Sequence, residues 1–252
     1  MSLARDLARC VDPACLAEAI GMDPDEWQLR ALRSTHLRQL YNCCRQSGKS
    51  VTAAVKAVHV AVYEPGSLVL LLSPSQRQST ELFLKVTTTY KALGRPVPSN
   101  QESATTLVLA NGSRVVSLPG TEGTTRGYSS VRLLIVDEAA RVPDDVLAAT
   151  RPQLAVSGGQ MIALSTPAGP NGWWARAWED AGAEYERYRV PAADVPRITP
   201  EFLASELALL GPHAFSAEYE CAFVAGSFTL FDEADLQAMF TTDFAPLFPN
   251  GV

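Results

Sequence analysis

Apolar residues along the chain form short continuous runs that alternate with longer segments of helical length. Residues 68–72, 133–136 and 160–164 are mostly apolar over the length of a strand, whereas residues 51–62 and 78–93 have the length of helices. Apolar runs without polar alternation are typical of parallel strands whose two faces are both covered. The pattern therefore predicts an α/β protein with a central, mainly parallel β-sheet flanked by helices.

Both ends of the chain carry further elements. Residues 3–20 fit one or two short amphipathic helices broken near Pro13, and a cap-like turn over residues 23–28 leads into another helix. Towards the other end, residues 185–190 indicate a strand and residues 200–223 a helical segment. Regular structure is therefore expected over most of the chain.

A hairpin interrupts the parallel order. Residues 106–109 and 114–118 have the composition of strands, and Asn111 and Gly112 stand between them, a pair suited to the positive φ angles of a tight turn. We predict an antiparallel excursion inside the otherwise parallel fold.

The run Gly48-Lys49-Ser50 ends a candidate phosphate-binding loop. A strand over residues 36–42 enters the loop and a predicted helix leaves it, which is the context that such a loop requires. Gly48 would allow the tight turn, Lys49 would place a charge against the phosphates, and the Ser50 hydroxyl would bind Mg²⁺. The generic loop pattern begins with glycine, and this chain has Cys43 there.

Two adjacent carboxylates follow a buried strand 87 residues after Ser50. Asp137 would hold Mg²⁺, directly or through water, and Glu138 would orient or deprotonate the attacking water. A phosphate loop combined with such a pair predicts Mg²⁺-dependent hydrolysis of ATP. Two other positions add to this prediction: Gln28 could reach the adenine edge, and the strand that ends near Ser165 would present a sensor of the γ-phosphate.

Composition narrows the choice of partners. With 252 residues, 47% of them hydrophobic, the chain can bury a large core, and no apolar stretch approaches the roughly 20 residues that cross a bilayer. We therefore expect a soluble protein without a membrane partner.

A net charge of −6 means that contact with a polyanion must come from a local basic surface. Candidates for that surface are Arg77, Lys85, Lys91, Arg95 and Arg114.

The order of these signals resembles the ATPase (motor) domain of the large terminase subunit, which packages DNA in tailed bacteriophages. The resemblance implies a P-loop NTPase fold of the ASCE type with a small C-terminal lid subdomain. It covers most of the chain. The matching motifs are Trp27-Gln28, Arg45-Gln46-Ser47-Gly48-Lys49-Ser50, Ser73-Pro74-Ser75-Gln76, Asn111-Gly112-Ser113, Thr125-Arg126-Gly127-Tyr128, Leu134-Ile135-Val136-Asp137-Glu138-Ala139-Ala140, Ser165-Thr166-Pro167, Gly169-Pro170-Asn171-Gly172, Phe215 and Glu218-Tyr219-Glu220.

The resemblance implies roles for the matching positions. It places Gln28 at adenine and gives the γ-phosphate sensing and coupling to Ser165 and Thr166. Arg45 resembles an arginine that terminases carry in this loop, so it would contact phosphate in cis, with an ion pair to a nearby carboxylate as the alternative. The residues implied at the nucleotide are Gln28, Arg45, Gln46, Ser47, Gly48, Lys49, Ser50, Ser165 and Thr166, with Ser50 and Asp137 at the metal.

Arg126 is the candidate arginine finger. It lies in the glycine-rich segment Gly123–Gly127, and a guanidinium delivered from a neighbouring subunit would stabilise charge on the γ-phosphoryl group. Catalysis would then be shared by Lys49, Glu138 and Arg126. A local structural ion pair of Arg126 is the alternative.

The expected organisation is an ATPase core over residues 1–180, with the helical segment 1–35 included, and a lid or linker over residues 181–252. Large terminase subunits carry a nuclease domain after the ATPase, and too few residues follow Phe231 to hold one. We therefore expect no DNA cleavage by this chain.

The resemblance also implies partners: double-stranded DNA, the portal protein, the small terminase subunit and further copies of the chain in a ring of five, all in the host cytoplasm. Two alternatives stay open. A helicase or other translocase would also use a motif like Ser73-Pro74-Ser75-Gln76, and a non-hydrolysing module would use ATP to gate assembly. The pair Asp137-Glu138 argues against the second, since a pure binder needs no carboxylate at the water.

Overall fold

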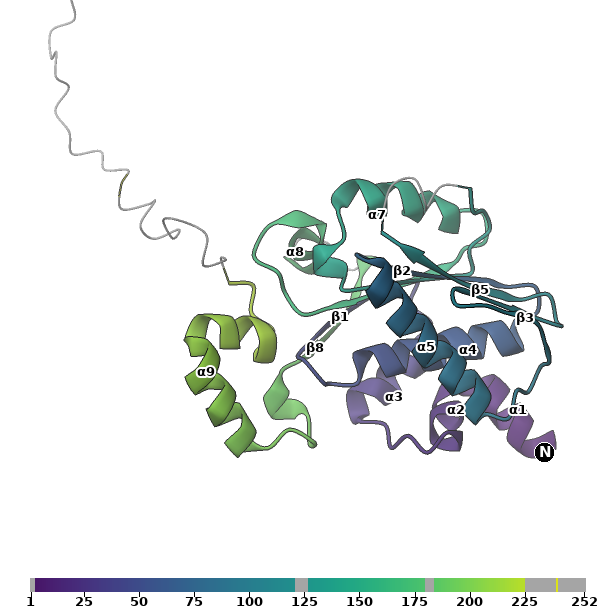
Figure 1. Ribbon diagram of the computed structural model, residues 1–252, viewed down its shortest axis with the longest axis horizontal. Coiled ribbons are helices and arrows are strands. Elements are labelled where there is room, and N and C mark those ends of the chain that lie inside the picture. Colours follow the sequence, from purple (N-terminus) through teal and green to yellow (C-terminus); the bar gives the residue numbers. More distant parts are fainter. Residues whose placement is uncertain (1–2, 121–126, 180–183, 225–238, 240–252) are drawn as a thin grey trace, which may run out of the picture.

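The computed structural model describes residues 3–120, 127–179, 184–224 and 239 of the chain. Their centre is a single mixed sheet with helices packed on both faces (Figure 1). The order across the sheet is β3-β4-β5-β2-β6-β7-β1-β8. The strands are β1 (Arg38–Cys43), β2 (Leu68–Ser73), β3 (Ser99–Glu102), β4 (Thr106–Leu109), β5 (Arg114–Pro119), β6 (Leu133–Asp137), β7 (Gln160–Ser165) and β8 (Glu186–Val190).

Pairing in the sheet follows the expected division. Six strands, from β5 across to β8, pair in parallel. The hairpin of β4 and β5 is antiparallel, so the predicted excursion is confirmed. A further antiparallel edge strand, β3, was not predicted from the sequence, and it extends the hairpin by one strand. The predicted class, a mainly parallel sheet flanked by helices, is confirmed.

Each face of the sheet has its own core because side chains alternate between the faces of a strand. Val69 and Leu71 of β2 pack into one apolar cluster with helices from the first half of the chain, and Leu70 packs into the cluster on the other face. The helices of the first cluster are α2 (Pro13–Ala19), α3 (Glu26–Arg33), α4 (Lys49–Tyr63) and α5 (Gln76–Ala92).

The opposite face is covered by α7 (Asp144–Thr150) and α8 (Gly172–Glu179), which Figure 1 shows above the sheet. Trp173 and Trp174 of α8 are 7% and 2% exposed and belong to this second core, so they serve as packing residues. Short 3₁₀ turns also lie in the connections that the structure describes, among them η1 (Ala139–Arg141), η2 (Arg151–Leu154) and η4 (Ala192–Asp194).

At the start of the chain, α1 (Leu3–Val11) and α2 are separate helices, because Asp12 caps α2 and Pro13 takes its first position. At the other end, the segment α9 (Pro200–Tyr219) consists of two helices rather than the single one expected, since Gly211 has φ 75° and ψ 164° and Pro212 follows it. The assignment of residues 181–252 to a lid stays a prediction, because much of this range lies outside the described residues.

None of the helices that the structure describes combines the length and the apolar character that a bilayer crossing needs.

Candidate functional site

The turn between β1 and α4 has the geometry of a phosphate loop. Gly48 has φ +89° and a Cβ at this position would lie 2.5 Å from Gln28 Nε2, so glycine is required on both counts. The Ser47 hydroxyl donates to the Cys44 carbonyl at 3.0 Å and closes the turn. Cys43, which stands where the generic pattern has glycine, is fully buried and packs in the core beneath the loop.

The loop opens into a pocket at the amino end of α4. Gly48, Lys49 and Ser50 line it, and so does Lys85 from α5. Lys49 is 8% exposed and donates to the Cys44 carbonyl at 3.4 Å, a long contact that leaves its ammonium group available to an anion. Two cations and a helix amino end therefore face one cavity, which favours a phosphate there. From the sequence alone, Lys85 is predicted only as part of a basic surface.

Asp137 ends β6 beside this pocket. It is 8% exposed and accepts a hydrogen bond from the Glu138 backbone N–H at 3.0 Å. Burial and the charge of Glu138 raise the pKa of Asp137 to about 6, against the opposing charge of Lys49. Among the described residues no ion pair neutralises Asp137. A buried carboxylate without a cationic partner is suited to bind a metal cation.

Sheet order explains why these groups meet. β7 lies between β6 and β1, so the carboxyl ends of all three strands share one edge. In this register Asp137 is opposite Leu164, and Asn42 is opposite Ser165. Ser165 Oγ and Asn42 Oδ1 are buried and have no hydrogen-bond partner within the part of the chain that the structure describes. Unsatisfied polar atoms at this edge fit a site that takes a hydrated ligand.

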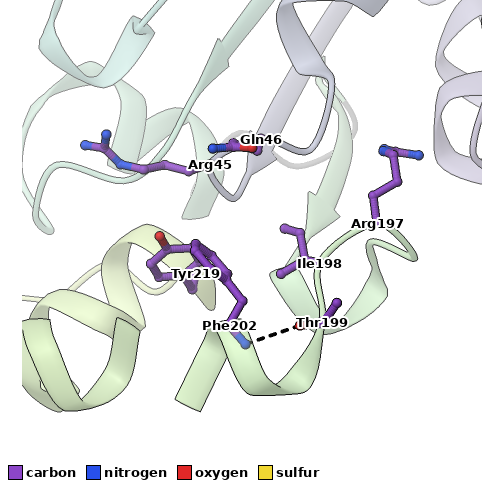
Figure 2. A pocket seen from close by; sticks show the side chains of 7 residues that line it. All are labelled: Arg45, Gln46, Arg197, Ile198, Thr199, Phe202 and Tyr219. Carbon is purple, nitrogen blue, oxygen red and sulfur yellow. Dashed lines mark hydrogen bonds between the residues drawn. The ribbon is translucent and has the colours of Figure 1, made fainter. Parts of the chain in front are cut away.

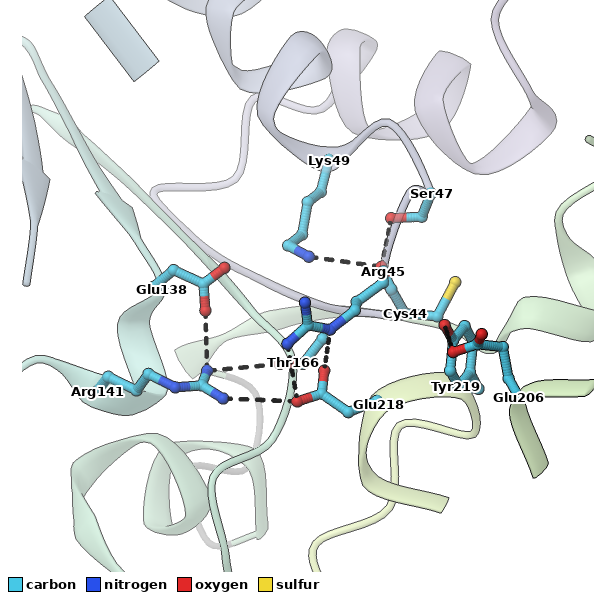
Figure 3. A network of polar contacts seen from close by, with 10 residues as sticks. All are labelled: Cys44, Arg45, Ser47, Lys49, Glu138, Arg141, Thr166, Glu206, Glu218 and Tyr219. Atoms are coloured by element: carbon cyan, nitrogen blue, oxygen red, sulfur yellow. Dashed lines mark hydrogen bonds and ion pairs between the residues drawn. The ribbon is translucent and has the colours of Figure 1, made fainter. Parts of the chain in front are cut away.

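Glu138 does not stand alone at the end of β6. It adopts the left-handed conformation with φ 49° and precedes η1, which carries Arg141. The Arg141 guanidinium lies 2.8 Å from the Glu138 carboxylate, donates to Thr166 Oγ1 at 3.4 Å and lies 3.8 Å from the carboxylate of Glu218 (Figure 3). The sequence predicts Glu138 and Thr166 at this place, whereas Glu218 belongs to a matching motif without a predicted role and Arg141 carries no sequence signal.

Glu218 joins this group to the phosphate loop. Arg45 donates to its carboxylate at 2.8 and 3.2 Å, and the Arg45 backbone N–H donates to its carbonyl at 3.2 Å. The alternative expectation for Arg45, an ion pair with a nearby carboxylate, is therefore what this structure contains. Burial raises the pKa of Glu218, but the hydrogen bond and charge of Arg45 and the charge of Arg141 outweigh it and hold the pKa below its usual value.

Gln28 lies beside the loop with 1% of its surface exposed, and its contact with adenine stays a prediction. Its Oε1 accepts from the Asp25 N–H at 2.8 Å in the capping box of α3, and its Nε2 lies 3.5 Å from the Ser47 carbonyl. Arg197 binds Asp25 at 2.7 Å and Ser47 O at 3.4 Å. A second pocket, whose lining includes Gln28 and Gly48, opens next to these contacts.

A third pocket, of about 280 Å³, separates the loop from α9. Figure 2 shows Arg45 and Gln46 on one side and the rings of Phe202 and Tyr219 on another. Its mixture of apolar and charged walls is typical of a site for a small organic ligand. Its lining residues are Arg45, Gln46, Arg197, Ile198, Thr199, Phe202 and Tyr219.

The structure thus brings most of the predicted site residues to one edge of the sheet. The loop residues 45–50, the pair Asp137 and Glu138, and Ser165 with Thr166 meet there, and Gln28 adjoins them. Arg126 lies outside the described residues, so its role stays a prediction.

Comparison with known proteins gives one family and a set of relatives. A family model described as terminase large subunit, T4likevirus-type, N-terminal, matches residues 40–238. The large terminase subunits of Thermus phage G20c and Thermus virus P23-45 are each 28% identical over 254 aligned positions, which cover 87% of this chain and 52% of each relative. The chain therefore spans about half the length of these relatives.

Solved structures show the same fold. The large terminase ATPase domain of Thermus phage P74-26 superposes with a TM-score of 0.75 at 24% identity, covering 82% of this chain and 97% of that domain. The large terminase of the thermophilic bacteriophage D6E, in complex with ADP, gives a TM-score of 0.66 at 12% identity, covering 83% of this chain and 53% of that protein. The predicted ASCE P-loop fold is confirmed.

Proposed function

Because the chain belongs to the terminase large-subunit family of the T4likevirus type, we propose that it is the domain that hydrolyses ATP to move double-stranded DNA into the procapsid. One observation carries the proposal. The phosphate loop with Lys49 and Ser50 opens beside the buried end of β6, where Asp137 and Glu138 lie. A triphosphate held by the loop would then face a carboxylate able to act on water.

The residues divide the work as follows. Lys49, the loop N–H groups and Arg45 hold the phosphates, and Ser50 and Asp137 would hold Mg²⁺. Bound there, Mg²⁺ would offset charge on the phosphate oxygens. Glu138 takes a proton from the attacking water while the water oxygen forms a bond to the γ-phosphorus. The bond between the γ-phosphorus and the bridging oxygen breaks, which releases ADP and phosphate. Ser165 and Thr166 would sense the γ-phosphate and transmit its loss to the rest of the domain.

Partners follow from the family. We propose that copies of the chain form a ring of five at the portal protein, with the small terminase subunit delivering the DNA. In this ring Arg126 of one subunit would reach the nucleotide of the next. The family match supports this assembly. Because the chain has a net charge of −6, its contact with DNA must come from local basic surfaces that the assembly gathers.

The decisive experiment measures the rate of ATP hydrolysis against protein concentration, with and without double-stranded DNA, for the wild type and Glu138→Gln. We expect the rate per subunit to rise with concentration, and Glu138→Gln to bind ATP but lose about two to four orders of magnitude in kcat. Bound nucleotide without turnover under any of these conditions would show that the chain is an ATP-gated assembly module instead. Unwinding of a tailed duplex would favour a helicase.

A further inference from the structure

Lys85 lines the phosphate pocket from a helix that no phosphate-binding motif includes. It belongs to α5, whereas the other described residues that line the pocket belong to the phosphate loop or to the start of α4. The cavity has a volume of about 420 Å³, and a water molecule occupies roughly 30 Å³. A hydrated phosphate chain therefore has room between Lys85 and the loop.

The packing of α5 fixes the position of Lys85. α5 lies beside α4 on the same face of the sheet (Figure 1). Leu82, Phe83 and Val86 of α5 are buried in the core on that face, whereas the Lys85 side chain is exposed. Because residues three and four apart share one side of a helix, the buried residues determine how α5 is rotated. This rotation brings Lys85 to the rim of the pocket.

The Lys85 ammonium group has no carboxylate partner in the part of the chain that the structure describes. Glu81, one turn earlier in α5, is also exposed but forms no ion pair with it. Further along the chain, Lys91 and Arg95 both bind Glu102, at 3.5 and 3.4 Å. Lys85 is therefore available to an anion in a way that Lys91 and Arg95 are not.

The position of Asp137 indicates which phosphate Lys85 would meet. Asp137 ends β6, and Lys85 is close enough to it for the two charges to attract each other. In the proposed reaction Asp137 and Glu138 lie at the γ-phosphate, because that is the group that water attacks. Lys85 is therefore on the γ-phosphate side of the pocket.

We propose that Lys85 binds the γ-phosphate of the nucleotide held by the loop of the same chain, and that this contact makes the site prefer a triphosphate to a diphosphate. A compact charge on a flexible stem suits this role. Lys49 from α4 and Lys85 from α5 would then flank the terminal phosphate, and the contact of Lys85 ends once hydrolysis removes that group. This inference rests on the proposed function, because it needs nucleotide at the loop.

A DNA phosphate is a second possible source of the same chemistry, since the sequence places Lys85 among the candidates for a basic surface. The position of Lys85 favours the nucleotide, because the cavity that it faces is lined by the phosphate loop. The two sources also predict different results when the charge is removed, so one variant distinguishes them.

The test is Lys85→Met, which removes the charge and keeps an unbranched side chain. Calorimetric titration with ADP and with β,γ-imido ATP, both with Mg²⁺ and without DNA, gives two dissociation constants. We expect the affinity for the imido analogue to fall about tenfold and the affinity for ADP to change by less than about twofold. The change in their ratio isolates the interaction of Lys85 with the γ-phosphate, as in a double-mutant cycle.

Two further variants serve as controls. Lys85→Arg keeps the charge and should keep most of the preference for the imido analogue. Lys91→Met makes the same chemical change on the same helix, but Lys91 binds Glu102 and lines a different groove, between α5 and the β3–β4 hairpin. Both dissociation constants of Lys91→Met should therefore match those of the wild type.

The ratio of the two constants decides the outcome. An equal loss of affinity for ADP and the imido analogue in Lys85→Met would indicate general damage to the loop, and no loss would exclude Lys85 from the site. Either result overturns the inference alone. Fluorescence anisotropy with a labelled DNA duplex, measured over a range of salt concentrations without nucleotide, tests the other source.

A contact with DNA has its own signature in this measurement. Weaker DNA binding by Lys85→Met, with a salt dependence reduced by about one ion and an unchanged nucleotide ratio, would assign Lys85 to DNA and overturn the inference. Wild-type protein that binds neither ADP nor the imido analogue would overturn the proposed function and the inference with it.

Discussion

The side-chain amide of Gln28 lies against the backbone of Gly48, so closely that a Cβ at residue 48 would be 2.5 Å from Gln28 Nε2. Two residues twenty positions apart in the sequence are therefore packed directly against each other at the phosphate loop. Gly48 also has φ +89°, a backbone conformation that L-residues with a Cβ avoid. Any other residue at position 48 would therefore clash with Gln28 and would also strain the backbone.

Gly48→Ala should weaken ATP binding by at least about tenfold, because left-handed backbone strain costs roughly 1–3 kcal/mol and the added methyl group displaces Gln28. Calorimetric titration with a non-hydrolysable ATP analogue measures the loss. In a Gln28→Ala background the contact is relieved and the φ strain is not, so Gly48→Ala should cost less affinity there than in the wild type. If Gly48→Ala costs nothing in that background, the φ angle is unimportant.

Asp137→Asn should stabilise the nucleotide-free protein at pH 7 while abolishing turnover. Burial and Glu138 raise the pKa of Asp137 to about 6 in the folded state, above the 3.8 of a free aspartate, so ionisation opposes folding. The stabilising effect of protonation is complete below pH 3.8 and is lost as pH rises through about 6. The variant avoids this cost, on the order of 3 kcal/mol at pH 7.

Thermal melting curves of the wild type and Asp137→Asn between pH 4 and 8 test this. The difference in melting temperature should be largest above pH 6 and disappear near pH 4. A variant less stable than wild type at pH 7 in the absence of nucleotide would contradict the burial argument. Adding Mg²⁺ and nucleotide should raise the melting temperature of the wild type only.

Arg126→Ala should retain nucleotide binding and lose roughly a thousandfold in assembly-stimulated kcat, as expected for an arginine finger. Mixing gives the sharper experiment. Glu138→Gln subunits supply Arg126 and Arg126→Ala subunits supply Glu138, so a mixture of the two inactive variants should recover activity at shared interfaces. No recovery, in a mixture shown to co-assemble, would place Arg126 in its own subunit's structure.

Arg197→Ala should raise KM for ATP about three- to tenfold, which corresponds to the loss of one charge-assisted contact. Arg197 ties Asp25, in the cap of α3, to the Ser47 carbonyl of the loop, so its loss lets Gln28 and the loop move apart. Steady-state kinetics should show a much smaller change in kcat. Arg176→Ala, which breaks an ion pair with Asp144 on the opposite face, serves as the control.

Much of the sheet could be predicted because its buried strands are apolar along their whole length. β2 and β6 are buried at every residue, and both were recognised from composition. β3 has the sequence Ser-Asn-Gln-Glu and is mostly exposed, so no hydrophobic signal marks it. The break in α9 was missed although Gly211-Pro212 signals it, because the surrounding residues have continuous helical character.

The candidate site divides in the same way. The phosphate loop and the acidic pair could be predicted because their spacing along the chain is part of their chemistry. Glu218, present only as part of a matching motif, and Arg197 have no role predicted from the sequence because their partners lie far away along the chain. Arg45 and Glu218, for example, are 173 residues apart. Arg141 lies only three residues from Glu138, but no motif marks it. The charge of Lys85 is evident from the sequence, but its position at the phosphate pocket depends on the packing of α5 against α4, which the sequence does not reveal.

The position of β7 between β6 and β1 restricts where residues can be inserted into the chain or deleted from it. β7 has 6 residues and is paired on both sides, so one inserted or deleted residue would reverse the face of each following side chain and remove Ser165 from its place opposite Asn42. Natural variants of this chain should therefore tolerate insertions after Thr166 and exclude them from residues 160–165.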